Sequence, residues 1–463
     1  MKKILCIIFV LACVYRVYPQ GNSFFATSLM SFPLGIEQPM EVFTSFEKAS
    51  KVPEKVLHLD LSHQRGFVFK ENTLSKMKNL RILKLCNTDL RELPAEILSL
   101  YFLQELDLGQ NPSLNLPTTF LTLQKITSLE KLSLRNSNLN QLPAEISKIT
   151  QLRELDLYQN NLEDLPNEFI YLQNLKSLYL QSNRFTNIPK QITKLKKIVH
   201  LDFYFNNIQE IDVDIQNLSQ LVYLNLSNNA ISTLPENFGE INLLSRLDLS
   251  KNALLNIGTN FSILARLPHL KYLNLADCGL SRLPDEIGLL QNLEELCLAN
   301  NGIAQLNPKI SNLISLKTLI LDKNRFVNLP TSLEKLTNIE NLHLASNPDL
   351  DWNKASKIIE KMTNLVFLNI SEGNITEIPA AISKLSLLQI LHLDNNQIKE
   401  IPENFIGLFY LRKLSFNQNM LTSLPDILGE MPHLEELNIK ANDINFEKME
   451  RYKKQFPSVR IQN

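Results

Sequence analysis

Four aspartates at regular intervals are the first residues whose type and spacing could do chemistry. Asp107, Asp156, Asp202 and Asp248 each stand between two apolar residues in the same local pattern. If each takes the same place on alternate strands of a parallel sheet, neighbouring members lie about 10 Å apart. An inverting glycosidase uses two carboxylates about 6.5–9.5 Å apart, but no second acidic column faces this one. Calcium needs several oxygens converging at about 2.3–2.6 Å, which a single column does not provide.

Histidine and cysteine recur in the same pattern further along the chain. His343 and His392 take equivalent positions two repeats apart, and so do Cys297 and His343. A nucleophile and its base must lie within hydrogen-bonding distance, and zinc needs ligands at about 2.0–2.1 Å. Side chains on alternate strands meet neither requirement. We therefore predict polar surface residues here, and a chain that is not an enzyme and holds no metal or cofactor.

The elements that must position these residues are copies of one repeat. Residues 152–170 read Leu-x-x-Leu-x-Leu-x-x-Asn-x-Leu-x-x-Leu-Pro-x-x-x-Ile, and the next copy opens 23 residues after the first, at Leu175. Leu155 and Leu157 point to one face of a short strand, and Leu152, Leu162, Leu165 and Ile170 turn inward as the chain curls back. A period of about 20–29 residues with this pattern is typical of leucine-rich repeats. The fold expected is an α/β solenoid: a right-handed horseshoe with a parallel sheet on the concave face and short helices or turns on the convex face.

One polar residue in each repeat also points inward. An amide buried at every turn should bond to the backbone of neighbouring repeats, because unpaired buried polar groups are costly. We therefore assign these asparagines to the scaffold: Asn160, Asn183, Asn206, Asn229, Asn252, Asn301, Asn324, Asn347, Asn396, Asn419 and Asn442. Thr88, Ser137, Cys278 and Gly373 replace the asparagine in other copies.

About seventeen copies occupy residues 56–444. They open at Val56, Leu80, Leu103, Leu129, Leu152, Leu175, Ile198, Leu221, Leu244, Leu270, Leu293, Leu316, Ile339, Leu365, Leu388, Leu411 and Leu434. The copies that open at Leu103, Leu244 and Ile339 are longer, with 26 residues each. The last of these offers Trp352 and a helical run over 354–361 on the outer face. We expect the longer copies to alter local curvature.

Both ends of the repeat array need a cap, since the first and last copies have one neighbour only. Residues 24–55 are expected to form the N-terminal cap, with a helix over 41–49. Residues 445–463 are expected to form the C-terminal cap around an amphipathic helix over 446–456. The roughly twenty residues that follow Ile444 leave no room for a catalytic domain.

Residues 1–23 have the form of an export signal, with a basic start followed by a short apolar run. Two processing schemes fit it. Val10-Leu11-Ala12-Cys13 resembles a bacterial lipoprotein box, which would leave Cys13 as a lipid anchor. A cut after Ser23 would instead release a soluble protein. The apolar run is too short to span a membrane comfortably, and no transmembrane segment is expected in the mature chain.

Two resemblances bear on location. The stretch Val56-Leu57-His58-Leu59-Asp60-Leu61-Ser62 and the Leu-Pro-x-x-Ile repeats are similar to exported bacterial leucine-rich repeat proteins over nearly the whole mature chain. This resemblance implies a secreted or cell-envelope binding protein. The same Leu-Pro-x-x-Ile repeats also resemble the Ras-associated group of leucine-rich repeat proteins, which implies a cytoplasmic signalling scaffold as the alternative.

The composition excludes several classes of partner. With 47 basic and 48 acidic residues the formal net charge is −1, so no basic field attracts nucleic acid or an anionic membrane. The five cysteines are scattered and imply no disulfide framework.

Outward residues of the strands line the concave sheet, where solenoids bind partners. The central repeats gather aromatic and polar side chains there, which is the composition that protein interfaces favour. The predicted partner-binding residues are Asp156, Tyr158, Tyr179, His200, Asp202, Tyr204, Phe205, Tyr223, Asp248 and Tyr272. A second candidate patch comprises Ile320, Phe367 and Ile390, with Cys297 beside them.

These observations together predict a binding module without enzymatic activity. The expected ligand is a protein or cell-surface molecule recognised by the concave face, in adhesion or host contact.

Overall fold

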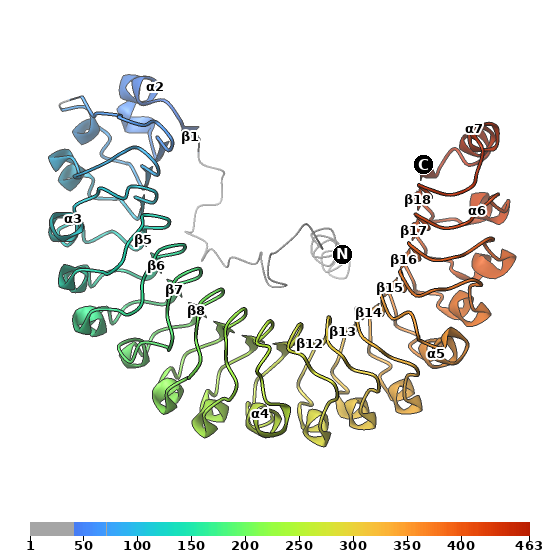
Figure 1. The fold of residues 1–463 in the computed structure, drawn as a ribbon. Helices are drawn as coiled ribbons and strands as arrows, with labels where there is room; N and C mark the ends of the chain where they lie inside the picture. The colour runs from blue at the N-terminus through green and yellow to red at the C-terminus, as the bar shows by residue number, and fades with distance from the viewer. Residues whose placement is uncertain (1–40, 71) are drawn as a thin grey trace.

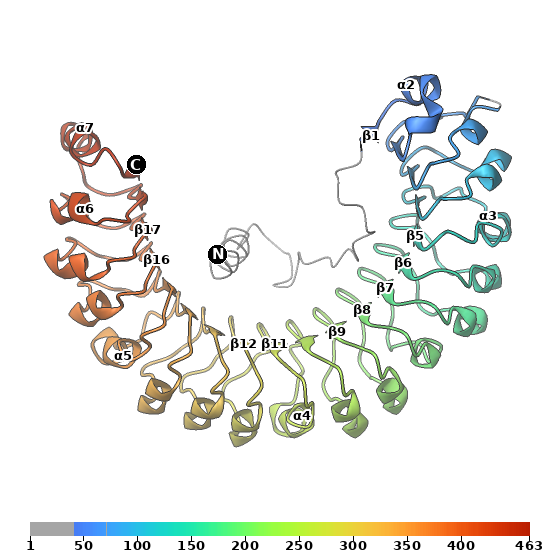
Figure 2. The same cartoon turned by 180° about the vertical axis from the view of Figure 1, so that it is seen from behind.

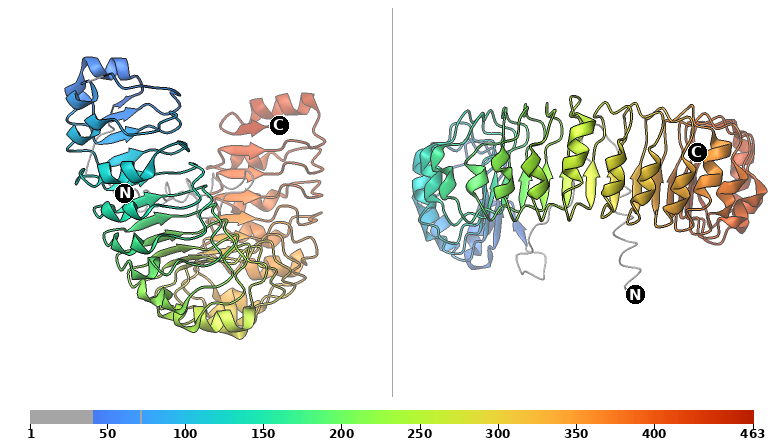
Figure 3. Two further views of the ribbon diagram at one scale, coloured as in Figure 1. Left: turned by 60° about the vertical axis from the view of Figure 1, so that its left-hand side comes forward. Right: turned by 90° about the horizontal axis from the view of Figure 1, so that it is seen from below.

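The computed structural model describes residues 41–70 and 72–463. Its strands form one open parallel sheet that lines the inside of a horseshoe, and short helices follow the outside (Figures 1 and 2). Viewed from below, the outer face shows these helices side by side (Figure 3). The α/β solenoid predicted from the repeat is therefore confirmed.

Each strand pairs in parallel with the next one along the chain, so the spatial order of the sheet follows the sequence. The strands are β1 (Val42–Phe43), β2 (His58–Asp60), β3 (Ile82–Lys84), β4 (Glu105–Asp107), β5 (Lys131–Ser133), β6 (Glu154–Asp156), β7 (Ser177–Tyr179), β8 (His200–Asp202), β9 (Tyr223–Asn225), β10 (Arg246–Asp248), β11 (Tyr272–Asn274), β12 (Glu295–Cys297), β13 (Thr318–Ile320), β14 (Asn341–His343), β15 (Phe367–Asn369), β16 (Ile390–His392), β17 (Lys413–Ser415), β18 (Glu436–Asn438) and β19 (Arg460–Gln462).

Short helices connect the strands on the outer side. The α-helices are α2 (Phe46–Lys51), α3 (Leu116–Leu123), α4 (Ile257–Leu264), α5 (Trp352–Ile359), α6 (Ile427–Glu430) and α7 (Phe446–Gln455). The 3₁₀-helices are η1 (Pro53–Lys55), η2 (Leu74–Lys76), η3 (Ala95–Ser99), η4 (Ala144–Lys148), η5 (Asn167–Tyr171), η6 (Ile192–Lys194), η7 (Val213–Asn217), η8 (Glu236–Glu240), η9 (Asp285–Leu289), η10 (Pro308–Asn312), η11 (Thr331–Lys335), η12 (Ala380–Lys384) and η13 (Glu403–Gly407).

Repeat length decides which kind of helix forms. The copies of 26 residues contain α3, α4 and α5, whereas most copies of 23 residues close with a 3₁₀-helix of three to five residues. Each longer helix begins at a side-chain cap: Asn115, Asn256 and Asp351 accept a hydrogen bond from a backbone N–H of the first turn. Three extra residues thus give room for a regular α-helix, which needs more chain per turn than a 3₁₀-helix.

The core is a continuous column of inward aliphatic side chains. Leu155, Leu157 and Leu162 are fully buried, as are their equivalents in neighbouring copies. The prediction that Ile170 turns inward is wrong, because Phe169 is the fully buried residue there and Ile170 is half-buried. η5 starts directly after Pro166, so its third residue rather than its fourth faces the core.

The asparagine ladder is bonded as predicted. In one rung, Nδ2 of Asn183 donates to the carbonyl oxygens of Leu157 (3.0 Å) and Leu180 (3.1 Å), and its Oδ1 accepts from the N–H of Leu162 (3.0 Å). Each rung therefore joins adjacent repeats through the backbone. The Nδ2 bonds recur along the array, so the amides act as scaffold, although the Oδ1 of Asn347 accepts no hydrogen bond.

The N-terminal end differs from the expected helix over 41–49. Val42 and Phe43 form β1, which pairs with β2, and the helix starts only at Phe46 because Ser45 caps it. The export signal (1–23), with the lipid anchor at Cys13, and the first part of the N-terminal cap (24–40) lie outside the described residues.

The C-terminal end is closed by α7, where a helix over 446–456 was expected. Tyr452 and Phe456 are buried, and the Tyr452 hydroxyl accepts a hydrogen bond from the Leu424 N–H (3.0 Å) in the repeat that opens at Leu411. β19 then adds one further strand to the sheet.

Candidate functional site

Three positions of each repeat point to the concave side, and we call them together the inner face. They are the first and third residues of the strand and the residue two places after the strand's third residue. In β6 these are Glu154, Asp156 and Tyr158, while Leu155 and Leu157 between them are fully buried. The next residue, Gln159, has a positive φ of 56°, which turns the chain away from the sheet. The inner face is therefore a grid with one row for each repeat.

The aspartates in this grid have a local structural role. Asp156, Asp202 and Asp248 each accept a hydrogen bond from the backbone N–H two residues later, at 2.8 to 2.9 Å. Asn225 and Asn274 occupy the same position on β9 and β11 and accept the same bond at 3.0 Å. Asp and Asn thus serve equally as the acceptor that shapes the turn after the strand.

Two of these carboxylates lie beneath the surface of the face. Asp202 and Asp248 are 7% and 1% exposed. Nδ2 of Asn225 donates to Asp202 (3.2 Å) and Nδ2 of Asn274 to Asp248 (3.1 Å). Burial raises the pKa of Asp202 to about 7 and that of Asp248 to about 6, although the hydrogen bonds to both carboxylates act in the opposite direction.

Aromatic rings on β7, β8 and β9 form a connected row on the same face. The ring of His200 lies 5.0 Å from that of Tyr179 and stacks on Tyr223 at 4.1 Å, with an angle of 4° between the planes. Burial lowers the pKa of His200 to about 4, so this imidazole is neutral at pH 7. Further along, the Arg246 guanidinium lies over the Tyr272 ring at 3.9 Å.

The most accessible aromatic side chains lie beside this row. Tyr158 is 40% exposed. Phe205, which follows the inner-face position Tyr204 and has the positive φ of that turn, is 56% exposed. The rings of Tyr204 and Phe205 are 6.0 Å apart. The structure therefore brings the ten predicted partner-binding residues together over β6–β11, with Tyr158 and Phe205 outermost and Asp202 and Asp248 underneath. That a partner binds them stays a prediction.

The second candidate patch is nearly covered by its own neighbours. Ile320, Phe367 and Ile390 are 4 to 5% exposed, and Ile320 packs against Cys297 and Ala299. A partner would meet little of this apolar surface unless the side chains moved.

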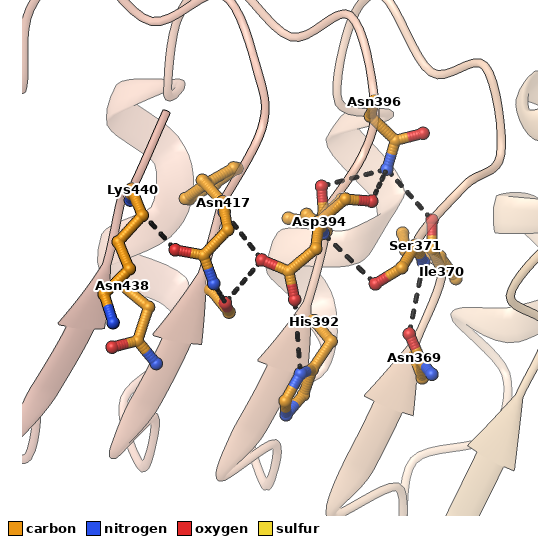
Figure 4. Close-up of polar contacts among 12 residues, drawn as sticks. Asn369, Ile370, Ser371, His392, Asp394, Asn396, Asn417, Asn438 and Lys440 are labelled. Atoms are coloured by element: carbon orange, nitrogen blue, oxygen red, sulfur yellow. Dashed lines mark hydrogen bonds and ion pairs between the residues drawn. The ribbon is translucent and has the colours of Figure 1, made fainter. Parts of the chain in front are cut away.

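The predicted site residues do not include every acidic residue of the inner face, and Asp322 and Asp394 are two of those missed. Asp322 accepts a hydrogen bond from the Ala345 N–H (2.7 Å), and Asp394 accepts one from the Asn417 N–H (2.6 Å), each in the next repeat. Figure 4 shows Asp394 with its partners. Both stand two residues after the third strand position, so aligning the repeats by column would have found them.

Each of these carboxylates faces a histidine. Nδ1 of His343 lies 3.7 Å from Asp322, and Nδ1 of His392 lies 3.6 Å from Asp394. The Phe367 ring stacks on His343 at 4.6 Å. Burial lowers the pKa of His343 to about 4, so its contact with Asp322 is not an ion pair at pH 7. The prediction of a surface residue is wrong for His343, whose side chain is only 14% exposed.

Hollows in the surface are open and shallow. One of about 570 Å³ lies at the strand edge, lined by residues that include Glu294, Lys317 and Glu340. Within residues 41–70 and 72–463, no group of three or more His, Cys, Asp or Glu side chains is placed to hold a metal ion. In the same part of the chain, no helix has the length and apolar character needed to cross a membrane. Cys86, Cys278 and Cys297 are free thiols.

Comparisons with known proteins agree with this geometry. A family model described as leucine-rich repeat region matches residues 256–370 and 349–451, and one described as leucine rich repeat matches residues 127–185 and 196–254. No curated protein sequence matches the chain significantly.

Solved structures provide further matches. A leucine-rich repeat protein of Leptospira interrogans is 28% identical, with a TM-score of 0.62, over 92% of this chain and 100% of that one. An internalin of Listeria monocytogenes is 22% identical, with a TM-score of 0.53, over 74% of this chain and 88% of that one. TLR13, in a complex with ssRNA13, is 21% identical, with a TM-score of 0.63, over 88% of this chain and 71% of that one. The last two matches show the fold alone. The chain therefore contains leucine-rich repeats, and its described residues form one open leucine-rich repeat solenoid.

Proposed function

We propose that this protein is a non-enzymatic binding module that recognises a protein ligand on the inner face of β6–β11. The observation that carries this proposal is the connected aromatic row with Tyr158 and Phe205 exposed beside it. Exposed aromatic side chains surrounded by polar groups are enriched at the centres of protein interfaces. A rigid sheet presents them with little loss of conformational entropy on binding.

We further propose that the protein is bacterial, exported, and held at the cell surface or secreted, where it acts in adhesion or host contact. The apolar leader in residues 1–23 supports export. The similarity to a Leptospira interrogans leucine-rich repeat protein over that protein's whole length supports a bacterial protein of the same kind. Cleavage after Ser23, or lipidation of Cys13, would produce the mature form.

Ligand capture tests the binding proposal. The mature chain would be immobilised and exposed to surface proteins of candidate host cells, and captured proteins identified by mass spectrometry. We expect Tyr158→Ala combined with Tyr204→Ala to abolish capture while the circular dichroism spectrum stays unchanged. A matched control replaces Tyr101 and Tyr171 by alanine, since both are exposed outside the inner face. Equal loss of capture in both double variants would overturn the assignment of the site.

Fractionation tests export. We expect the product outside the cytoplasm and shortened at Cys13 or Ser23 in intact-mass measurements. An unprocessed product confined to the cytoplasm would instead support the signalling-scaffold alternative.

A further inference from the structure

We propose that the inner face of β6–β13 binds a basic, arginine-bearing segment of the partner protein in an extended conformation. This inference rests on the proposed function of the same face and adds the chemistry of the ligand. Four observations carry it: the local charge, the interchangeability of Asp and Asn, an unpaired glutamate, and the exposed aromatic faces.

Charge on the inner face is unevenly distributed. Over β6–β13 its positions carry six carboxylates and one cationic side chain, Arg246. The carboxylates are Glu154, Asp156, Asp202, Asp248, Glu295 and Asp322. The flanking strands β2–β5 and β14–β18 are balanced instead. Their inner-face positions carry five carboxylates, Asp60, Glu105, Asp107, Asp394 and Glu436, and five cations, Lys84, Lys131, Arg135, Lys413 and Lys440. The excess of acidic over basic groups is therefore confined to the centre of the arc. Burial raises the pKa of Asp202, Glu295 and Asp322 to about 7, so a cation brought by a partner would favour their ionised forms.

The turn geometry does not require this negative charge. Asn225, Asn274 and Asn369 accept the backbone hydrogen bond that Asp156 accepts in its own repeat. A neutral amide is therefore sufficient to shape the turn. Burying a carboxylate where an amide serves costs free energy, and a cation brought by a partner would offset that cost.

Glu295 is a further carboxylate of the inner face with little positive charge near it. It stands at the first position of β12, and within the described part of the chain its carboxylate receives no hydrogen bond. Burial raises the pKa of Glu295 to about 7, and only Arg246 opposes this shift. A second cation above β12 would stabilise the ionised form of Glu295.

The aromatic side chains favour arginine over lysine as that cation. The Arg246 guanidinium already lies over the Tyr272 ring at 3.9 Å, so a planar cation fits against this row. Tyr158 and Phe205 expose ring surface within the same acidic region. Guanidinium groups stack on aromatic faces and are more weakly hydrated than ammonium groups, so they lose less on leaving water.

The size of the region sets the length of the ligand segment. Parallel strands are about 4.8 Å apart, so β6 to β13 covers roughly 34 Å. An extended chain advances about 3.4 Å for each residue, and about ten residues would therefore cross the region.

Peptide titration tests the inference with the full mature chain. The probe is a fluorescein-labelled octa-arginine peptide, measured by anisotropy at roughly 0.15 M salt, where long-range attraction is screened. Octa-glutamate and a single-stranded RNA are the comparison ligands. We expect octa-arginine to bind and the other two not to bind. Stronger binding of RNA or octa-glutamate would overturn the inference.

Matched variants distinguish binding at the inner face from non-specific attraction to negative charge. Asp156→Asn with Glu295→Gln, and separately Tyr158→Leu with Phe205→Leu, should each weaken octa-arginine binding at least about tenfold. Glu168→Gln with Glu403→Gln removes the same charge from exposed outer positions and should change it less than about twofold. Equal weakening by the outer pair would show that the peptide responds to the overall negative charge rather than to a site on the inner face, and would contradict the inference.

A natural ligand, once captured, distinguishes this inference from the proposed function. If capture depends on Tyr158 and Tyr204 but is unchanged in Asp156→Asn with Glu295→Gln, the face binds a protein and the basic-segment inference is wrong. If capture does not depend on the inner face at all, the proposed function fails together with it.

Discussion

Replacing one asparagine of the ladder gives the most quantitative test of how the repeats hold together. Asn252 is fully buried, and its Nδ2 donates to the carbonyl oxygens of Leu226 (3.0 Å) and Leu249 (2.8 Å). Its Oδ1 accepts from the Ile231 N–H (3.0 Å). Asn252→Ala removes these three bonds and leaves the Ile231 N–H buried without a partner. The Leu226 carbonyl keeps the bond from Asn229 Nδ2 (3.0 Å), and the Leu249 carbonyl keeps the one from Cys278 Sγ (3.2 Å).

The expected loss follows from the three bonds removed and the one group left unpaired. A net contribution of about 1 kcal/mol for each bond, and a further penalty for the orphaned Ile231 N–H, gives a loss of roughly 3–5 kcal/mol in the free energy of unfolding. Asn252→Thr should lose about half as much, because Thr88 occupies the equivalent position and its Oγ1 donates to the Leu85 carbonyl (2.9 Å). The alanine and threonine variants therefore form a graded pair.

Urea unfolding followed by circular dichroism measures the loss, and hydrogen exchange locates it. Exchange is needed because long repeat arrays can open locally rather than all at once. We expect faster exchange at Ile231 and in the flanking repeats, with distant repeats unchanged. A loss below about 1 kcal/mol, with normal protection at Ile231, would refute the account of the ladder.

Three further predictions concern particular sites. Gly373→Ala should destabilise the protein by about 1–3 kcal/mol, because an added Cβ would lie 2.9 Å from the Trp352 ring. Gly258→Ala should not destabilise it, because the nearest atom to an added Cβ there is 3.7 Å away. Urea unfolding of both variants checks this. Asp202 has a raised pKa of about 7, so the folded state holds a proton that the unfolded state releases near pH 4. The stability of the wild type relative to Asp202→Asn should therefore fall as pH rises from about 4 to 7. A stability difference that is independent of pH would contradict the burial of this carboxylate. Three cysteines are buried, and burial raises the pKa of each thiol: Cys86, Cys278 and Cys297. At these positions native protein should therefore react with iodoacetamide far more slowly than urea-unfolded protein. Rapid labelling of these cysteines in the native chain would show that the sites open.

The sequence was sufficient for the features that each repeat specifies alone. Alternation along a strand determines that Leu155 and Leu157 point to the core and that Asp156 points to the inner face, and the structure agrees. The ladder of asparagines follows from the same alignment of repeats, because a buried amide must find backbone partners.

Features that depend on neighbouring repeats could not be read in this way. Ile320 and Phe367 are on the inner face as expected, but side chains of adjacent strands cover them, because rows about 4.8 Å apart pack against each other. The low exposure of His343 has the same origin, since Phe367 from the next strand stacks on it. A pattern within one repeat identifies the face but not how deep a side chain lies in it.

Site-specific photo-crosslinking tests the central claim, that the inner face is the binding face. A photoreactive phenylalanine would replace Tyr158 on the inner face or, as the matched control, Tyr171 on the outer side; both tyrosines are exposed, at 40% and 59%. We predict that the captured protein ligand crosslinks to position 158 and not to position 171. Crosslinking at position 171 alone would contradict the claim and place the ligand on the outer side.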